Sequence, residues 1–217
     1  GMHGKSTVTA MLGHILERAG QDPTVACGAV MLSEESPYRA GTGGCVYEAC
    51  EYLRAFLCFS PEVAVILNID DDHTDCYPTL DSAEAAFADF LAQSRAAVVS
   101  ADDPRVMRAA AACPGEVTTF SLSDRRADGY AEDISFAHGR YAFTLVWKGE
   151  RVGRIRVGTV GRYNVANALA AAAAALSVGV PAEAVCDSLS GERGVKRRME
   201  YRGSYQKTAF YDDYAHH

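Results

Sequence analysis

The sequence has no run of about 18–20 consecutive apolar residues, so nothing in it predicts a membrane-spanning helix. It has no excess of positive charge either, because 28 acidic residues against 21 basic ones give a formal net charge of -7. Phosphate backbones and anionic headgroups are repelled by a surface of that sign, which argues against nucleic acid and membranes as partners. No internal repeat or low-complexity linker is visible, and the composition excludes disorder, collagen and coiled coil.

Paired cysteines are missing as well. The seven cysteines are odd in number, and none belongs to a Cys-x-x-Cys pair. This pattern predicts reduced thiols in a cytoplasmic protein. What the sequence does contain is the composition of an ordinary globular protein, with 48% hydrophobic and 23% charged residues in 217 positions. That length suits one α/β domain with a further segment attached. A hydrophobic core of this size is stable without disulfide bonds or structural metals.

Apolar periodicity predicts alternating strands and helices. From Lys5 to Ala19 apolar residues recur at helical spacing, and Gly20 supplies a stop. Strand-like runs follow at Thr24–Ala26, Cys45–Tyr47, Val63–Ile69 and Ala96–Ser100, separated by helix-like stretches such as Ser82–Gln93 and Pro104–Ala112. This alternation predicts an α/β fold with a mostly parallel sheet flanked by helices.

The segment from Gly129 to Val157 has a different pattern. Residue type alternates along two strand-like runs, Tyr141–Trp147 and Val152–Val157, which flank a turn at Lys148-Gly149-Glu150. This pattern predicts a small antiparallel β subdomain. Helical patterning resumes at Tyr163–Leu176 and Pro181–Leu189, before a strand-like run at Thr208–Tyr211.

A glycine-rich turn opens the first predicted helix. It reads Gly1-Met2-His3-Gly4-Lys5-Ser6-Thr7. Such a turn aims backbone N–H groups and the positive helix end at one spot, where Lys5 would meet the β/γ-phosphates of a nucleotide and Ser6 a Mg²⁺ ion. The first glycine of the full phosphate-loop pattern would precede residue 1. A plain helix start without ligand is the alternative.

An acidic loop follows the apolar strand Val63–Leu67. It contains Asp70-Asp71-Asp72-His73, and a similar polar break, Glu48-Ala49-Cys50-Glu51, follows the preceding strand. Ligands of open α/β sheets bind at the carboxyl ends of strands. We therefore expect Glu48 and His73 to approach each other at neighbouring strand ends and to share Mg²⁺. A solvated turn is the alternative.

Two further motifs carry polar side chains. Asn164 and Asn167 lie three residues apart at the start of the alanine-rich helix, where they could contact an adenine edge. From spacing alone, a helix cap is the better interpretation of Asn164. The basic stretch Gly194–Glu200 could bring an arginine to a phosphate, or it could be a solvated turn.

Taken in order, these motifs resemble those of the central ATPase domain of the Mur ligases, the ATP-dependent amino-acid ligases of peptidoglycan synthesis. The shared motifs are Gly1–Thr7, Glu48–Tyr52 with Phe56-Leu57 following, Asn68–His73, Asn164–Leu169, Gly194–Arg198 and Asp212–His217. Six ordered motifs are far more specific than any one of them. Within the family, the branch that joins L-alanine to UDP-N-acetylmuramate is the most similar.

The resemblance implies how ATP and magnesium are bound. His3, Gly4, Lys5, Ser6 and Thr7 would hold the ATP phosphates, with Ser6 on one Mg²⁺ ion. It further implies that two residues outside this loop, Glu48 and His73, hold magnesium near the γ-phosphate. The implied reaction is ADP-forming amide synthesis through an acyl phosphate, in which positioned cations stabilise the transferred phosphoryl group.

Other roles follow from the same resemblance. Asn164 and Asn167 would contact the nucleotide, and Arg198 would contact a phosphate. Asp213 would reach the nucleotide when a C-terminal domain closes, and His216-His217 would face the amino-acid side of the cleft. Tyr163 stands where the family usually has histidine, and Pro37 lies in a loop that usually contacts the UDP-sugar. Substrate handling is therefore expected to differ more than ATP binding.

The resemblance also divides the chain. Residues 1–200 are expected to be the central ATPase domain, with the upstream strand and the N-terminal UDP-binding domain missing, and residues 201–217 the start of a C-terminal amino-acid-binding domain. UDP-N-acetylmuramate and an amino acid would be the partners of the complete enzyme, and the oligomeric state stays open. A ligase that recycles muropeptides, a folylpolyglutamate synthetase-like ligase and a non-catalytic nucleotide-binding module are the alternatives.

Overall fold

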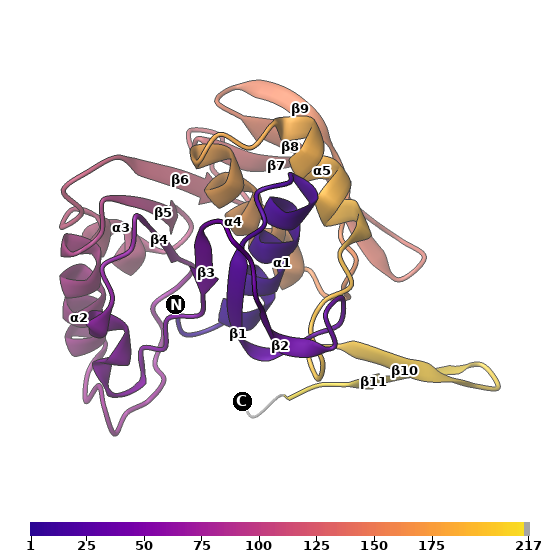
Figure 1. Ribbon diagram of the computed structural model, residues 1–217, viewed down its shortest axis with the longest axis horizontal. Helices are drawn as coiled ribbons and strands as arrows, with labels where there is room; N and C mark the ends of the chain where they lie inside the picture. Colours follow the sequence, from indigo (N-terminus) through magenta and orange to yellow (C-terminus); the bar gives the residue numbers. More distant parts are fainter. Residues whose placement is uncertain (215–217) are drawn as a thin grey trace.

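A six-stranded sheet forms the centre of the protein in a computed structural model that describes residues 1–214 (Figure 1). Its strands, in spatial order, are β4 (Val63–Ile66), β5 (Ala96–Ser100), β6 (Val117–Ser121), β7 (Gly129–Ala137), β8 (Arg140–Trp147) and β9 (Glu150–Arg156). The first four run parallel to one another, and β8 is antiparallel to both of its neighbours, β7 and β9. The predicted α/β fold with a mostly parallel sheet is confirmed.

The predicted hairpin around Gly149 is present, and its strands extend the central sheet. The junction is the parallel pairing of β6 with the start of β7, where Phe120 lies opposite Gly129. A Cβ atom at Gly129 would lie 3.2 Å from the ring of Trp147, so a larger residue there would push the β8 side chain away. The small residue lets the antiparallel strands follow the parallel ones without a break.

A second sheet lies beside α1. It has three strands, β1 (Thr24–Met31), β2 (Ser36–Arg39) and β3 (Cys45–Tyr47), in the order β2-β1-β3. β1 runs five residues beyond the predicted strand and pairs in parallel with β3. The strands β3 and β4, which the sequence suggested as neighbours, belong to different sheets.

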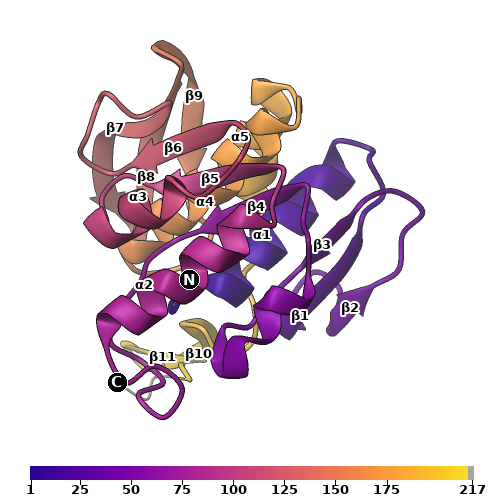
Figure 2. The ribbon, with the colours of Figure 1, turned by 90° about the vertical axis from the view of Figure 1, so that its left-hand side faces the viewer.

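Helices cover both faces of the central sheet (Figure 2). They are α1 (Lys5–Arg18), α2 (Leu80–Ala92), α3 (Pro104–Ala110), α4 (Tyr163–Ser177) and α5 (Ala182–Gly191), with a short 3-10 segment, η1 (Tyr52–Cys58). Helix α2 begins two residues before the predicted Ser82, because the Thr79 hydroxyl caps the helix by accepting the Ser82 N–H.

The core is divided by the central sheet. On one face, α4 packs against α1, α5 and the sheet, and its run of small side chains from Ala170 to Ala175 is buried all round. On the other face, α2 and α3 cover β4 and β5 through an aromatic group that includes Phe56, Phe87 and Phe90. Buried alanines bring the α4 backbone close to its neighbours, which fixes α1 and the turn before it.

The last two strands stand apart from the body. β10 (Glu200–Tyr205) and β11 (Thr208–Asp212) pair antiparallel with each other and project as a ribbon (Figure 1). All seven cysteines are free thiols, as the odd count and the spacing predicted. Within residues 1–214 no helix is long and apolar enough to cross a membrane.

Candidate functional site

The turn before α1 has the geometry of an anion cradle. Gly4, which precedes the first helical residue, has a left-handed backbone with φ of 87°, and no side chain caps the helix there. A Cβ atom at this position would lie 2.5 Å from Oδ1 of Asn167. Glycine is therefore required for both conformation and space, and the first N–H groups of the helix are left to bind an anion.

Asn68 ties the turn to the end of β4. The N–H of His3 donates to Asn68 Oδ1 at 2.8 Å, and Asn68 Nδ2 donates back to the His3 carbonyl at 3.0 Å. The imidazole of His3 lies 3.4 Å from a carboxylate oxygen of Asp70 in the acidic loop. This reciprocal pairing holds the backbone of the cradle against the carboxyl end of the sheet.

Lys5 is held by a carboxylate that the sequence analysis did not select. Its Nζ donates to Glu51 Oε1 at 2.8 Å and to the Met2 carbonyl at 3.0 Å. Glu51 is completely buried, and its Oε1 also lies 3.2 Å from Nε2 of His73. Its Oε2 has no hydrogen-bond partner among the described residues. The structure thus joins Lys5 to His73 through Glu51.

Tyr77 fixes the backbone of this carboxylate. Its hydroxyl donates to the Glu51 carbonyl at 2.5 Å, and burial raises the pKa of Tyr77 to about 12, so the phenol keeps its proton. Glu51 was within reach of sequence reasoning, because it closes the polar break that begins at Glu48. Its burial depends on the short 3-10 segment that follows it, which has no clear sequence pattern.

Glu48 makes direct contacts with Ser6 and Gly28. The Ser6 hydroxyl donates to Glu48 Oε1 at 3.1 Å, and the Gly28 N–H donates to Glu48 Oε2 at 2.6 Å. Burial raises the pKa of the nearby Cys27 thiol to about 11, so this thiol is protonated and uncharged beside the carboxylate. A hydroxyl and a carboxylate oxygen at the cradle form a donor set that fits magnesium, which prefers oxygen ligands.

His73 follows the acidic loop in a left-handed conformation, with φ of 55°. Its N–H donates to Asp72 Oδ1, and its ring packs against that of Tyr52 at 5.2 Å between centroids. Residues 1–214 contain no group of three or more His, Cys, Asp and Glu side chains arranged to hold a metal ion. A metal at the cradle would therefore rely on few protein ligands, with water and phosphate oxygens completing its shell.

The two asparagines of α4 bond to each other. Asn167 Nδ2 donates to Asn164 Oδ1 at 2.8 Å, and Asn164 Nδ2 donates to the Val160 carbonyl at 2.7 Å. Both side chains are buried, and Asn164 lies inside the helix, where the cap position belongs to Arg162. Through Asn167 Oδ1, this pair lies directly beneath Gly4.

The basic stretch Gly194–Glu200 lies near the turn that precedes α1, although the two are far apart in the sequence. A polar cavity of about 590 Å³ is lined by Ser6 and Gly28 on one side and by Lys196, Arg197 and Arg198 on the other. The Arg197 and Arg198 guanidinium groups lie 4.9 and 5.4 Å from the ring centre of Tyr214. The structure therefore places Arg198 and the Ser6 side of the cradle on one cavity.

Asp213 lies close to this cavity. Its Oδ2 accepts the Met199 N–H at 2.7 Å, so the chain end is tied to the residue after Arg198. The neighbouring His216-His217 pair lies outside the described residues.

The model of the Mur ligase middle domain matches residues 1–175 of this chain. The chain belongs to the Mur ligase family. Curated relatives include the UDP-N-acetylmuramate–L-alanine ligases of Syntrophotalea carbinolica, at 36% identity, and Aquifex aeolicus, at 38%. Both alignments cover the whole chain and 48% of the relative, so this Mur ligase chain spans about half the length of the curated relatives it matches.

Solved structures of Mur ligases share the fold. The UDP-N-acetylmuramate–alanine ligase of Thermotoga maritima superposes with a TM-score of 0.86 at 30% identity, over 99% of this chain and 49% of that one. The UDP-N-acetylmuramate:L-alanyl-γ-D-glutamyl-meso-diaminopimelate ligase of Neisseria meningitidis gives 0.79 at 26% identity, over 90% and 65%. The family resemblance predicted from six motifs is confirmed.

Proposed function

We propose that this chain is the ATP-binding middle part of a ligase that joins L-alanine to the lactyl carboxylate of UDP-N-acetylmuramate. The observation that carries the proposal is the glycine-cradled helix start at Lys5 and Ser6, together with the cavity that Ser6 and Arg198 line. The names of the most similar relatives support this choice of substrates. Residues 1–200 would form the middle domain, and residues 201–217 would begin a C-terminal one.

The proposed reaction consumes ATP and releases ADP and phosphate. The carboxylate oxygen attacks the γ-phosphorus, the bond to the β,γ-bridging oxygen breaks, and an acyl phosphate and ADP result. The uncharged amine of the amino acid then attacks the acyl carbon, loses a proton and expels phosphate. Each step gathers negative charge, so Lys5 and Arg198 act by stabilising phosphoryl oxygens from opposite sides of the cradle.

Magnesium would be held by the hydroxyl of Ser6 and the carboxylate of Glu48, which already lie in contact. His73 is assigned to the same cation-binding edge through water, because imidazole is a poorer magnesium ligand than oxygen. When bound, the ion neutralises charge on the phosphate oxygens. Lys5 must exchange its contact with Glu51 for one with phosphate, and the carboxylate of Glu51 would then retain His73.

The nucleotide base belongs to the outer part of the proposed site. Asn164 and Asn167 are assigned to it, and the contacts they now make with each other and with Gly4 would position the cradle relative to α4. Asp213 is assigned to the nucleotide in the closed protein, where a further domain would cover the cavity beside Arg198.

Phosphate release by the intact protein tests this function. We expect release with ATP, magnesium, UDP-N-acetylmuramate and L-alanine together, and none when the sugar nucleotide or the amine is omitted. The 217-residue chain by itself should give no release, because bringing the reactants together supplies roughly 7–11 kcal/mol of barrier lowering and depends on the missing parts. Release by this short chain that requires both substrates would contradict the proposed division into domains.

A peptide-joining ligase is the second candidate, and the fold shared with the Neisseria meningitidis protein favours it. The same assay separates the two when L-alanine is replaced by L-alanyl-γ-D-glutamyl-meso-diaminopimelate. Turnover with the tripeptide and none with L-alanine would establish the second candidate. No turnover with either amine, combined with ATP binding, would identify a non-catalytic nucleotide-binding module.

A further inference from the structure

One face of the antiparallel half of the central sheet carries no helix. Helices α4 and α5 cover the inner face of β8 and β9 through a core that includes Phe143 and Ile155. Within residues 1–214, the core beneath α2 and α3 contains no residue of β7, β8 or β9. In Figure 2, β9 lies at the far end of the sheet from α2. The outer face of β7–β9, on the side away from α4 and α5, is therefore open.

The register of β8 with β9 gathers three arginines on this outer face. Arg156 lies opposite Ala142, and Arg154 lies opposite Thr144. Arg140 lies two residues before Ala142 on β8, so it is diagonal to Arg156. The residues that alternate with them along the two strands belong to the inner core. Neighbouring and diagonal positions on paired strands are close enough for three long side chains to reach one ligand.

These arginines are not neutralised by carboxylates. Among residues 1–214, Arg140, Arg154 and Arg156 form no ion pair, whereas Arg151 pairs with two carboxylates of β7 at 2.7 and 2.6 Å. Arg154 donates to the Ser135 hydroxyl at 2.7 Å, which holds its guanidinium group over the sheet. Three neighbouring charges of one sign repel one another, and a bound anion would relieve that repulsion.

The charge of the β8–β9 hairpin is opposite to that of the whole chain. Residues 140–156 contain five basic side chains and one acidic side chain, whereas the formal net charge of the chain is -7. An anionic partner is repelled by an acidic surface and attracted to a basic one. The charge distribution therefore steers such a partner to this face.

The chemistry of the face favours carboxylates of a protein as its ligand. Planar guanidinium groups bind carboxylates through two parallel hydrogen bonds. The side chains between the three arginines are the small ones of Ser135 and Ala142. They offer neither a large apolar group that could enter a bilayer nor a ring on which a nucleic-acid base could stack. They do leave room for a peptide backbone close to the sheet.

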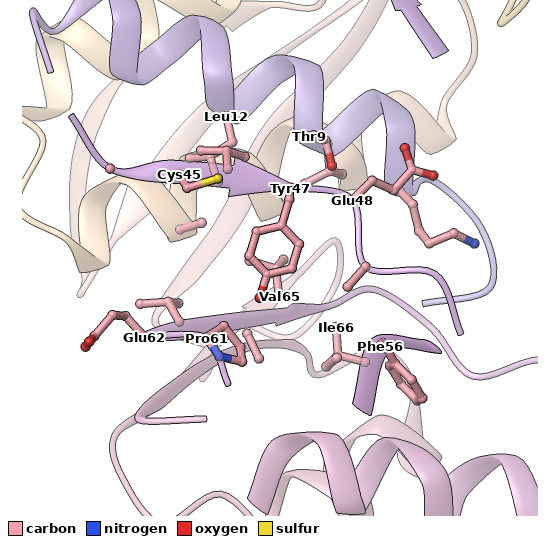
Figure 3. Close-up of a pocket in the computed structure, with 18 of the residues that line it drawn as sticks. Thr9, Leu12, Cys45, Tyr47, Glu48, Phe56, Pro61, Glu62, Val65 and Ile66 are labelled. Atoms are coloured by element: carbon pink, nitrogen blue, oxygen red, sulfur yellow. The ribbon is translucent and has the colours of Figure 1, made fainter. Parts of the chain in front are cut away.

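Two hollows elsewhere in the molecule differ from this face. The slot between β3 and β4, of about 520 Å³, is lined mainly by apolar side chains, and in Figure 3 the ring of Tyr47 lies beside Val65. The cavity beside Arg198 is basic, but it belongs to the proposed nucleotide site. An acidic segment could therefore bind at two basic surfaces, which experiment must separate.

We propose that the outer face of β7–β9, around Arg140, Arg154 and Arg156, docks a carboxylate-rich segment of a partner protein. The carboxylates of the segment would pair with the three guanidinium groups, and its backbone would lie over Ser135 and Ala142. None of these residues belongs to the proposed nucleotide site, so docking and ligation are separate properties of the chain.

Binding of a fluorescent oligoglutamate peptide tests the proposal. The 217-residue chain and the intact protein should both raise the anisotropy of this peptide. A peptide with glutamine in place of every glutamate should not bind. Added salt should weaken binding, because it screens exposed charges.

Three variants that each remove three positive charges locate the binding site. Arg140→Gln/Arg154→Gln/Arg156→Gln should weaken binding of the peptide roughly tenfold or more. Two control variants should bind the peptide as the natural chain does. They are Arg95→Gln/Arg126→Gln/Arg202→Gln, at scattered exposed positions, and Lys196→Gln/Arg197→Gln/Arg198→Gln, at the cavity.

Urea unfolding checks that the variants are folded. The three substituted arginines of the face are exposed, so the unfolding midpoint should not change. If the loss of the Ser135 contact unfolds the triple variant, Arg140→Gln/Arg156→Gln provides the same test. Neither of these two side chains forms a hydrogen bond within residues 1–214, and their joint removal should still weaken binding severalfold.

Four results would overturn the proposal. The first is equal affinity of the face variant and the natural chain for the peptide. The second is an equal loss in all three charge variants, because net charge alone would then explain binding. The third is binding by the 217-residue chain and none by the intact protein, since another part of the protein would then cover the face. The fourth is capture of the natural chain by phosphatidylglycerol vesicles without binding of the peptide. All four are independent of whether the protein ligates L-alanine.

Discussion

The turn at Gly4 and the β10–β11 ribbon lie at opposite extremes of constraint, although both border the cavity that contains Arg198. Asn68, Glu51 and Asn167 reach the turn from three different parts of the fold. The ribbon pairs with itself, and its large side chains, such as Tyr205, lie in solvent. This difference shows that contacts within this chain position the proposed phosphate-binding turn. The part of the proposed site beside the ribbon would depend on what packs against β10 and β11.

The largest expected effect comes from breaking the ion pair beneath the turn. Lys5→Met leaves the buried carboxylate of Glu51 without its cation, and such a break costs about 3 kcal/mol or more in free energy of unfolding. Urea unfolding measures the change. The double variant Lys5→Met/Glu51→Gln should recover most of the loss, because no unpaired charge is then buried.

The exposed pair Arg95–Glu62 is the matched control. Both side chains are more than three-quarters exposed, so Arg95→Met should cost less than about 1 kcal/mol. A loss as small for Lys5→Met would show that the turn is no more constrained than the surface.

A pH-dependent loss of stability is expected from Glu192, the buried residue at the end of α5. Its carboxylate accepts the Gly194 N–H at 2.6 Å, and burial raises its pKa from 4.5 to about 7. Below pH 4.5 the group is protonated in both folded and unfolded chains, and its contribution is complete. As the pH rises to 7, the unfolded chain ionises first, so stability is lost.

Glu192→Gln isolates this contribution. Relative to this variant, the natural protein should lose about 2–3 kcal/mol in free energy of unfolding between pH 5 and pH 8. Denaturant curves at several pH values give the difference. A constant difference across that range would mean that the Glu192 carboxyl is not shielded from water.

Gly4→Ala should have a smaller effect on stability, about 2 kcal/mol. The left-handed backbone disfavours alanine, and its Cβ atom would contact Asn167 Oδ1. Gly20→Ala is the control, because φ is 75° there and no described atom lies within 4 Å of the added Cβ. Thermal unfolding should show the larger loss for Gly4→Ala, which should also weaken nucleotide binding. Equal losses would mean that backbone strain alone explains the glycine.

The ribbon should tolerate substitution. Tyr205 is 71% exposed near its tip, so Tyr205→Ser should change the free energy of unfolding by less than about 0.5 kcal/mol. Leu169→Ala in the buried face of α4 should cost about 2–5 kcal/mol by comparison. A large loss for Tyr205→Ser would show that the ribbon already contributes to the core of this chain.

The sequence predicted elements well where periodicity and turns are local. The apolar spacing from Val8 to Ile15 marked α1, and the run at Val63–Leu67 marked a buried strand. It could not predict that β3 and β4 belong to different sheets, because strand pairing depends on tertiary contacts. The sequence analysis did not select Glu51 for a related reason. A carboxylate becomes a buried partner of lysine through the packing around it, and nothing in its own neighbours marks it.

Titration of the 217-residue chain with ATP and magnesium tests the central claim, that the turn at Gly4 is a phosphate site. We expect binding that Lys5→Ala weakens roughly tenfold or more, since a hydrogen bond to a charged group contributes about 1.5–3 kcal/mol. Tyr205→Ser should bind ATP as the natural chain does. Equal affinity of Lys5→Ala and the natural chain for ATP would contradict the account.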